Sequence, residues 1–327
     1  MDFMIRSGVL VKYHGEERTV IIPNNVTRIG CRAFTLCGTI KKVIIPDSVT
    51  EIGDRAFTIS SLESITIPDS VKSIGRAAFS SCDELEAITI PDSVKNIGKY
   101  AFSGCSKLKN VTIPNSITSI EMFTFNNCKS LTNVIISNGV TSIGKGAFSG
   151  CENLTNINIP DSVTNIGERA FCRCEELTDI SIPNGVTNIG KGAFSGCKNL
   201  TNINIPESVT NIEFEAFNGC ESLTSIAIPK CVNEIKRGTF EECKSLSSVS
   251  IANGIKKIGP SAFAHCSSLT SVIIPLSVTS IGVKAFYNCD NLKKAIILSS
   301  GYRSPKAFDK HTDVLHRSRK FKIKKNF

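Results

Sequence analysis

The chain has 327 residues, a formal net charge of +9, 41% hydrophobic and 7% aromatic residues, 14 cysteines and no tryptophan. This apolar fraction excludes a wholly disordered chain, and no apolar run approaches the roughly 18 to 20 residues of a membrane-spanning helix. Residues 1–10 include Asp2 and Arg6 and lack a long apolar core, so they do not predict a signal peptide.

The first predicted element is a β-hairpin at the N-terminus. Residues 3–5 and 9–11 are rich in apolar side chains and flank the turn sequence Arg6-Ser7-Gly8. Such a hairpin would cover the apolar end of the segment that follows it. We therefore expect residues 1–19 to form an N-terminal cap.

A short repeat fills most of the remaining chain. A phenylalanine recurs at 34, 57, 79, 102, 125, 148, 171, 194, 217, 240, 263 and 286, so that ten intervals are 23 residues and one is 22. A unit of this length cannot bury its own apolar side chains, and stacked copies bury them against one another. Twelve copies therefore predict one elongated array.

The copy at residues 147–169, AFSGCENLTNINIPDSVTNIGER, indicates how each coil is built. The alternation Ile157-x-Ile159 predicts a strand with one buried face. Pro160 cannot donate a ladder hydrogen bond and should end that strand. Val163 and Ile166, three residues apart, are expected to point back into the core. Gly167, which follows them, permits a tight bend or a positive φ.

These features predict a repeat solenoid, of α/β or mainly-β class, over residues 20–298. About 12 coils would place a parallel β-sheet along one side, with strands about 4.8 Å apart. The fuller pattern, Ile-Pro-Asp-Ser-Val-Thr-x-Ile-Gly-x-x-Ala-Phe-x-x-Cys-x-x-Leu, resembles the BspA-like class of leucine-rich repeats. It departs from the commonest leucine-rich pattern in having Ser162 where an Asn or Cys usually lies, so the usual Asn ladder is not expected.

The resemblance implies a parallel-stranded solenoid that binds other proteins. It also implies kinship with surface and adhesion proteins of bacteria and parasitic protists. The absence of a signal peptide and the many thiols favour a reducing, cytoplasmic location instead, so the location stays open. We expect a monomer.

The C-terminal region is expected to differ from the repeats. Residues 295–298 are the last predicted strand, and residues 299–327 are a predicted cap and basic tail. Within that region, residues 302–327 are expected to break the repeat pattern. The tail cations that could contact phosphate groups or anionic lipid are Arg317, Arg319, Lys320, Lys322, Lys324 and Lys325. The alternative for this segment is a solvated tail or a cap.

The cysteines predict a buried ladder. Eleven of them lie three residues after a repeat position that holds phenylalanine, and Ser60 takes that slot in one coil. A straight row of thiols does not converge as a tetrahedral zinc site requires, although some disulfides remain possible by distance. We expect reduced thiols packed in the core, and exposure of the off-register Cys31, Cys172 and Cys231.

No set of residues predicts catalysis. His265 beside Cys266 is a Cys-His neighbour, but adjacent residues of an extended segment point apart. Phosphate-binding loops and hydrolase or metalloprotease motifs are not found. We therefore expect no enzyme, no cofactor and no metal.

The outward face of the strands is the predicted binding surface. In each coil, the residues eight and ten positions after the phenylalanine should point outward in rows. The central candidates are Asn133, Asn156, Asn158, Asp179, Ser181, Asn202, Asn204 and Ser225. These side chains could bind a protein or a glycan, or could only solvate the face and bond to one another. The alternative functions are a structural or self-associating spacer and a tail that binds anionic surfaces.

Overall fold

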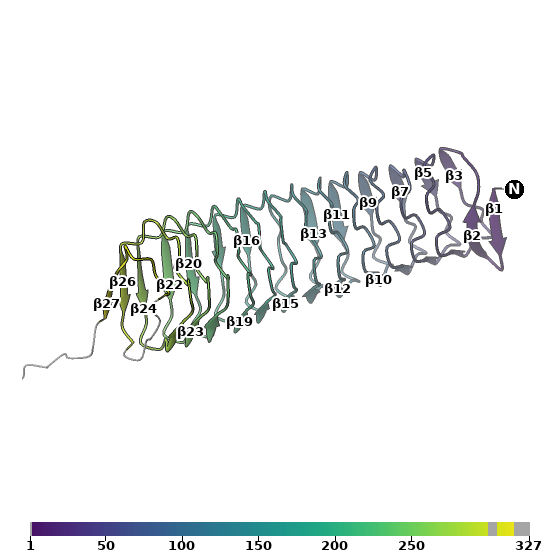
Figure 1. Ribbon diagram of the computed structural model, residues 1–327. Coiled ribbons are helices and arrows are strands. Elements are labelled where there is room, and N and C mark those ends of the chain that lie inside the picture. The colour runs from purple at the N-terminus through teal and green to yellow at the C-terminus, as the bar shows by residue number, and fades with distance from the viewer. Residues whose placement is uncertain (1, 300–305, 317–327) are drawn as a thin grey trace, which may run out of the picture.

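The computed structural model describes residues 2–299 and 306–316. It is one elongated stack of coils with the N-terminus at one end (Figure 1). The described residues contain strands and turns but no helix, so the mainly-β form of the predicted solenoid is the one observed. Within the same residues there is no helix that could cross a membrane.

The N-terminal hairpin forms as predicted and closes the first coil. β1 (Phe3–Arg6) and β2 (Val9–Tyr13) pair antiparallel, with Ser7 and Gly8 at positive φ in the turn. β2 then continues as a parallel neighbour of β4 (Arg28–Ile29). Leu10 and Tyr13 are buried, so the hairpin supplies the apolar cover that the first coil needs.

The longer strands form the predicted parallel ladder along one side of the stack. They are β3 (Thr19–Ile21), β5 (Lys42–Ile44), β7 (Ser64–Thr66), β9 (Ala87–Thr89), β11 (Asn110–Ile113), β13 (Asn133–Ile136), β16 (Asp179–Ser181), β18 (Asn202–Asn204), β20 (Ser225–Ile228), β22 (Ser248–Ile251), β24 (Ser271–Ile274), β26 (Lys294–Ile297) and β27 (Asp313–His316). The coil between β13 and β16 contributes only a bridge, from Asn156 to Asp179. Equivalent residues of paired coils lie side by side, which sets their outward side chains in rows.

A second parallel ladder, not predicted from the sequence, runs along another side. Its two-residue strands are β4, β6 (Glu51–Ile52), β8 (Ser73–Ile74), β10 (Asn96–Ile97), β12 (Ser119–Ile120), β14 (Ser142–Ile143), β15 (Asn165–Ile166), β17 (Asn188–Ile189), β19 (Asn211–Ile212), β21 (Glu234–Ile235), β23 (Lys257–Ile258) and β25 (Ser280–Ile281). Two residues are too short to show a period of two in the sequence. The stack therefore has parallel sheets on two sides, where one was expected.

The segment around each phenylalanine forms the third side and has its own hydrogen-bond pattern. In one coil, the N–H groups of Gly146, Phe148 and Gly150 each donate to a carbonyl of the next coil at 2.8 Å. The residues two before and two after the phenylalanine have positive φ, and many of them are not glycine. All these N–H groups point towards the C-terminal end of the stack, and the accepting carbonyls point towards the N-terminal end.

The core is a continuous column of repeat side chains. Consecutive phenylalanine rings from Phe34 to Phe286 stack with centroids 4.8–5.6 Å apart and planes within 10°. All twelve rings are essentially inaccessible to solvent. Each coil therefore buries apolar area against both neighbours, which is the main stabilising contribution in such an array.

A serine ladder replaces the usual asparagine ladder. The hydroxyl of Ser162 donates to the carbonyl of Val140 in the preceding coil at 2.6 Å, and Ser93 and Ser208 make the equivalent bond at 2.8 Å. The departure from the common leucine-rich pattern therefore keeps a side-chain bond from coil to coil.

Gly167 and its equivalents have a different role from the one predicted. They do not have positive φ; a Cβ on Gly167 would lie 2.8 Å from the carbonyl carbon of Gly144. The glycine allows neighbouring coils to approach closely. The slot holds Glu121, Glu213 and Lys236 in three coils. The second ladder is interrupted before the coils of Glu121 and Lys236, between β10 and β12 and between β19 and β21, whereas β19, in the coil of Glu213, stays paired with β17.

The repeat pattern continues beyond the last predicted strand. Phe308 stacks on Phe286 with ring centroids 4.8 Å apart, and β27 pairs parallel with β26. The expectation that residues 302–327 break the pattern is therefore wrong for residues 307–316, which form a shortened further coil. The six tail cations from Arg317 to Lys325 lie outside the described residues.

Candidate functional site

The predicted strand-face residues lie together on one exposed surface. The eight candidates from Asn133 to Ser225 are all exposed. Paired strands set Asp179 beside Asn202, and Ser181 beside Asn204. The rows continue outward to Asn110 and Ser248, which pair with Asn133 and Ser225. We call the eight candidates the polar strip.

The side chains of the polar strip keep most of their hydrogen-bonding capacity. Asn156 and Asn202 each donate to the hydroxyl of the threonine before them, at 3.5 and 3.4 Å. The other six make no side-chain hydrogen bond or ion pair within residues 2–299 and 306–316. They therefore do not bond to one another along the rows.

Asparagines of the second ladder behave in the opposite way. The amide of Asn188 donates to Asn165 at 3.3 Å, and Asn211 donates to Asn188 at 2.6 Å. These three side chains are half-buried and connect successive coils. The same residue type thus has a structural role on one side of the stack and stays available for a ligand on the other.

Two hollows flank the polar strip on the strand face. One, of about 600 Å³, lies over β5 and β7 and is lined by Ile44 and Thr66 among others. The other, of about 430 Å³, lies where β22 and β24 are not hydrogen-bonded, and it exposes part of Val249 and Ile251. The sequence interpretation missed these hollows, although the isoleucines of the outward rows gave a signal.

Exposed isoleucines lie on the strand face at Ile135, inside the polar strip, and at Ile44 and Ile273, beyond it on either side. Ile44, Ile135 and Ile273 occupy the same outward row as Asn158 and Asn204 and are 41–57% exposed. The strand face therefore combines a polar centre with apolar flanks, the composition that protein-binding surfaces use for contact and orientation.

The ladder cysteines are buried thiols with a fixed hydrogen-bond partner. Ten of them, from Cys82 to Cys289, are buried and donate to the carbonyl of the phenylalanine in the preceding coil at 3.1–3.3 Å. Burial raises the pKa of Cys128 to about 12. The thiols therefore stay protonated and act as donors as well as filling space.

The cysteines outside this ladder differ in exposure. Cys31 and Cys231 are exposed as predicted, but Cys172 is half-buried. Cys37, expected in the buried ladder, is also half-buried, because it lies in the first coil next to the cap. Burial raises the pKa of Cys172, while Arg169 and Arg173 oppose that effect.

His265 and Cys266 do not form a catalytic pair. The thiol of Cys266 points inward to the carbonyl of Phe240, whereas the His265 ring lies 3.2 Å from the amide of Asn288 and packs edge-on against Tyr287. Within the described ranges, no cluster of three or more His, Cys, Asp or Glu side chains could hold a metal ion.

A regular stack of short coils with a parallel strand face defines a leucine-rich-repeat solenoid. A family profile described as BspA type leucine rich repeat region matches residues 12–121, 72–201 and 187–314 in six copies. The chain therefore belongs to the BspA-type leucine-rich repeat family. Leucine-rich repeat proteins are in general interaction scaffolds and are typically non-catalytic.

Solved structures support this assignment. A leucine-rich repeat protein from Bacteroides ovatus is 31% identical, with a TM-score of 0.74 over 95% of this chain and 94% of the other. A leucine rich cell surface protein from Faecalibacterium prausnitzii is 34% identical, with a TM-score of 0.62 over 93% of both chains. The pneumococcal vaccine antigen PcpA, 20% identical over 92% of this chain and 74% of the other, shares the fold with a TM-score of 0.52. No curated protein matches this chain.

Proposed function

We propose that this protein is a non-catalytic recognition scaffold whose strand face binds a protein or a glycan-bearing surface. The observation that carries the proposal is the polar strip, in which six of eight exposed side chains have no partner of their own among the described residues. Amide and hydroxyl groups can both donate and accept hydrogen bonds. Short side chains of this kind lose little conformational entropy when a ligand orders them.

The charge of the strip fits a neutral or weakly basic ligand surface. Asp179 is its one ionised residue, and the other seven are asparagine or serine. Electrostatic steering is therefore weak, and specificity comes from hydrogen bonds, with Ile135 and Ile273 supplying apolar contact. The cell-surface description of the Faecalibacterium relative supports a recognition role of the adhesion type.

Two lysine substitutions on the strip test the proposal. Asn156→Lys and Asn202→Lys lie in a row where Lys42 and Lys294 occur naturally, so the fold should accept them. The matched control is Thr164→Lys with Thr187→Lys, at the exposed residues directly before β15 and β17, in a row that contains Lys72 and Lys95. Both double variants add the same charge.

Affinity capture from host-cell surface extracts, together with a glycan array, provides the readout. Ligands retained by the wild type and by the threonine variants but lost by the asparagine variants support the proposal. Identical ligands for all three proteins would remove the strand face as the site. Concentration-dependent assembly in light scattering without any captured ligand would favour a self-associating spacer.

A further inference from the structure

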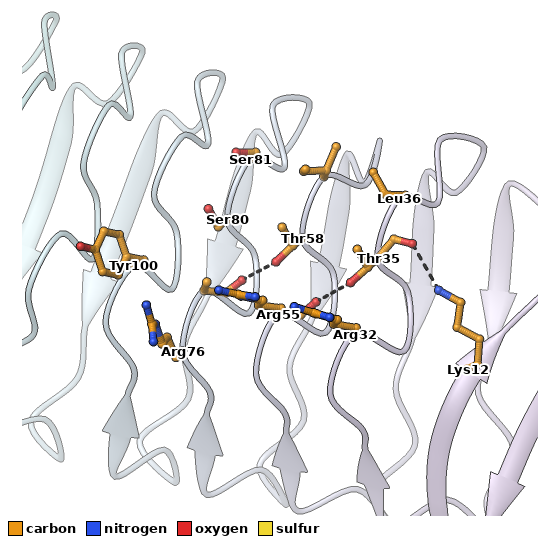
Figure 2. A pocket seen from close by; sticks show the side chains of 12 residues that line it. Lys12, Arg32, Thr35, Leu36, Arg55, Thr58, Arg76, Ser80, Ser81 and Tyr100 are labelled. Atoms are coloured by element: carbon orange, nitrogen blue, oxygen red, sulfur yellow. Dashed lines mark hydrogen bonds between the residues drawn. The ribbon is translucent and has the colours of Figure 1, made fainter.

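A basic cavity of about 720 Å³ lies on the phenylalanine side of the first coils, away from the strand face. Figure 2 shows its side chains in rows along the stack. Its lining consists of Lys12, Arg32, Thr35, Leu36, Arg55, Thr58, Ile59, Arg76, Ala77, Ser80, Ser81 and Tyr100. Among the residues that the structure describes, none that lines the cavity is acidic.

One side of the cavity is a row of guanidinium groups. Arg32 and Arg55 occupy the same slot of successive coils, two residues before the phenylalanine, and lie next to each other in Figure 2. In the third coil Ala77 holds that slot, and Arg76, one residue earlier, extends the row. Within the described part of the chain, none of the three arginines forms an ion pair. Nine ion pairs there join other residues of neighbouring coils, for example Lys107 and Glu84. Three like charges in a row repel one another, and an anion would relieve that repulsion.

Neighbouring charges do not neutralise the row. The carboxylate of Asp54, which precedes Arg55, accepts a hydrogen bond from the backbone N–H of Arg76 at 2.8 Å and does not line the cavity. Lys12 adds a further cation at the N-terminal end, where its ammonium donates to the carbonyl of Thr35 at 3.4 Å.

The opposite rim of the cavity is aliphatic. Leu36 and Ile59 occupy a row two residues after the phenylalanine and are 68% and 53% exposed. Both have positive φ, as do Arg32 and Arg55, in rows where other coils place glycine. Exposed aliphatic residues in this conformation carry a conformational cost, so both walls hold side chains that the backbone does not favour.

Hydroxyl groups lie between the two walls. Thr35 and Thr58 donate to the carbonyls of Arg55 and Ala77, at 2.9 and 2.7 Å, and their oxygens remain free to accept. Ser80 continues this row in the third coil (Figure 2). An occupant with backbone N–H groups would find acceptors along the floor.

We propose that this cavity binds an extended acidic peptide segment in which acidic and aliphatic residues alternate. In an extended chain, side chains alternate between two sides, and those on one side are about 6.7 Å apart. The three coils are 4.8 and 5.1 Å apart at their phenylalanine rings, closer than the side chains of the peptide, so two carboxylates lie over the three arginines. A guanidinium can bind a carboxylate with two hydrogen bonds, and aliphatic side chains cover Leu36 and Ile59. Peptide N–H groups face the hydroxyl row.

A nucleic acid suits the cavity less well. Single-stranded nucleic acids bind through aromatic faces on which bases stack. Of the described residues that line the cavity, Tyr100 alone is aromatic. Its ring is stacked on Phe123, with centroids 5.1 Å apart, and the guanidinium of Arg76 lies over it, 5.8 Å from the centroid. The Tyr100 ring, on which a base would have to stack, is therefore already in contact with Phe123 and Arg76.

The test uses the full chain and a fluorescein-labelled peptide of four Glu-Leu repeats, with binding followed by fluorescence anisotropy. We expect saturable binding whose affinity falls at higher salt. The double variant Arg32→Gly with Arg55→Gly should bind the peptide at least tenfold more weakly. Glycine is native to that row at Gly146 and Gly192, so this variant should fold. The matched control is Arg169→Gly, an arginine of the same row placed between those two glycines, and it should bind as the wild type does.

The aliphatic wall is tested separately. Leu36→Ser with Ile59→Ser introduces the residue that Ser81 provides naturally in the next coil of that row. This variant should lower the affinity for the Glu-Leu peptide several-fold. A Glu-Ser peptide should bind the wild type less tightly than the Glu-Leu peptide does, and its affinity should be the same in the variant. The proposal is overturned if the Glu-Leu peptide does not saturate, or if Arg169→Gly weakens it equally. Heparin or oligo-dT binding at Arg32 and Arg55 more tightly than the peptide would also overturn it.

Discussion

The carboxylate of Asp309 accepts a hydrogen bond from the backbone N–H of Asn288 over 2.7 Å. The one-directional hydrogen-bond column on the phenylalanine side has N–H groups that point towards the C-terminal end. At its last full coil Lys284 and Phe286 donate to the backbone carbonyls of Lys306 and Ala307, and the Asp309 carboxylate takes the place of the third carbonyl. At the opposite end the ammonium of Lys12 donates to the carbonyl of Thr35. A negative group at the N–H end and a positive group at the carbonyl end complement the dipole of the column, as capping charges do in a helix.

Replacing Asp309 with alanine should loosen the last coil. The N–H of Asn288 would lose its acceptor, which by analogy with helix caps costs about 1 kcal/mol. Because each coil contacts only its neighbours, the loss should appear as faster amide hydrogen exchange around Asn288 with little change in the central coils. The control is Asp290→Ala, which removes an exposed aspartate one residue after the last buried ladder thiol. Equal amide exchange around Asn288 in the two variants would contradict the capping role of Asp309.

The buried thiols predict steep alkaline destabilisation. Burial raises the pKa of Cys82 to about 11 and that of Cys289 to about 12, whereas a thiol in an unfolded chain has a pKa of about 8.5. Since the folded pKa is the higher one, this contribution to stability is complete below about pH 8.5 and is lost as the pH rises towards the folded pKa. Each thiol should lower the free energy of unfolding by about 1.4 kcal/mol per pH unit in that window.

A single serine substitution isolates this effect. Cys128→Ser should reduce the slope of unfolding free energy between pH 9 and 10 by about 1.4 kcal/mol per pH unit, measured by urea denaturation with a reductant present. Ser60 occupies the same slot in another coil and bonds to the thiol of Cys82 at 3.4 Å, so a serine can be accommodated. Cys31→Ser removes an exposed thiol and should leave the slope unchanged; a similar change in both variants would refute the prediction.

Two neighbouring glycines should differ in their tolerance of alanine. A Cβ on Gly190 would lie 2.4 Å from the carbonyl carbon of Gly167 in the preceding coil, so Gly190→Ala should force the coils apart and cost about 2–3 kcal/mol. A Cβ on Gly192 would meet only side-chain atoms at 3.5 Å or more. Gly192→Ala should therefore lower the free energy of unfolding by about 1 kcal/mol, mainly because alanine disfavours the positive φ. Denaturation midpoints that rank the variants in the reverse order would contradict this reading.

Thiol labelling should follow burial. In the native state Cys31 and Cys231 should react first with a maleimide, and the half-buried Cys37 and Cys172 more slowly. The ten buried ladder thiols should react only when the chain opens, since both burial and the raised pKa disfavour the thiolate. Peptide mass spectrometry after timed labelling gives the order, and early modification of Cys151 would show that the ladder is accessible.

Much of the fold follows from single positions repeated along the chain. The recurrence of Phe148 every 23 residues requires stacking, and the alternation around Ile157 places the residues of the polar strip outward. The second ladder and the role of Gly167 were not predictable, because both depend on how closely one coil approaches the next. The further coil at Phe308 was missed although Phe308 follows Phe286 by 22 residues, because Leu298 replaces the proline that ends the strand and His311 replaces the ladder cysteine.

The sequence by itself determined that this protein is a stack of BspA-type coils, because no other arrangement buries the same apolar positions twelve times over. Only the tertiary structure decided which polar residues are free. Asn188 and Asn204 are chemically the same, but one meets its neighbour in the next coil and the other faces solvent. The same holds for Arg32, Arg55 and Arg76, which line one cavity only when three successive coils are stacked side by side.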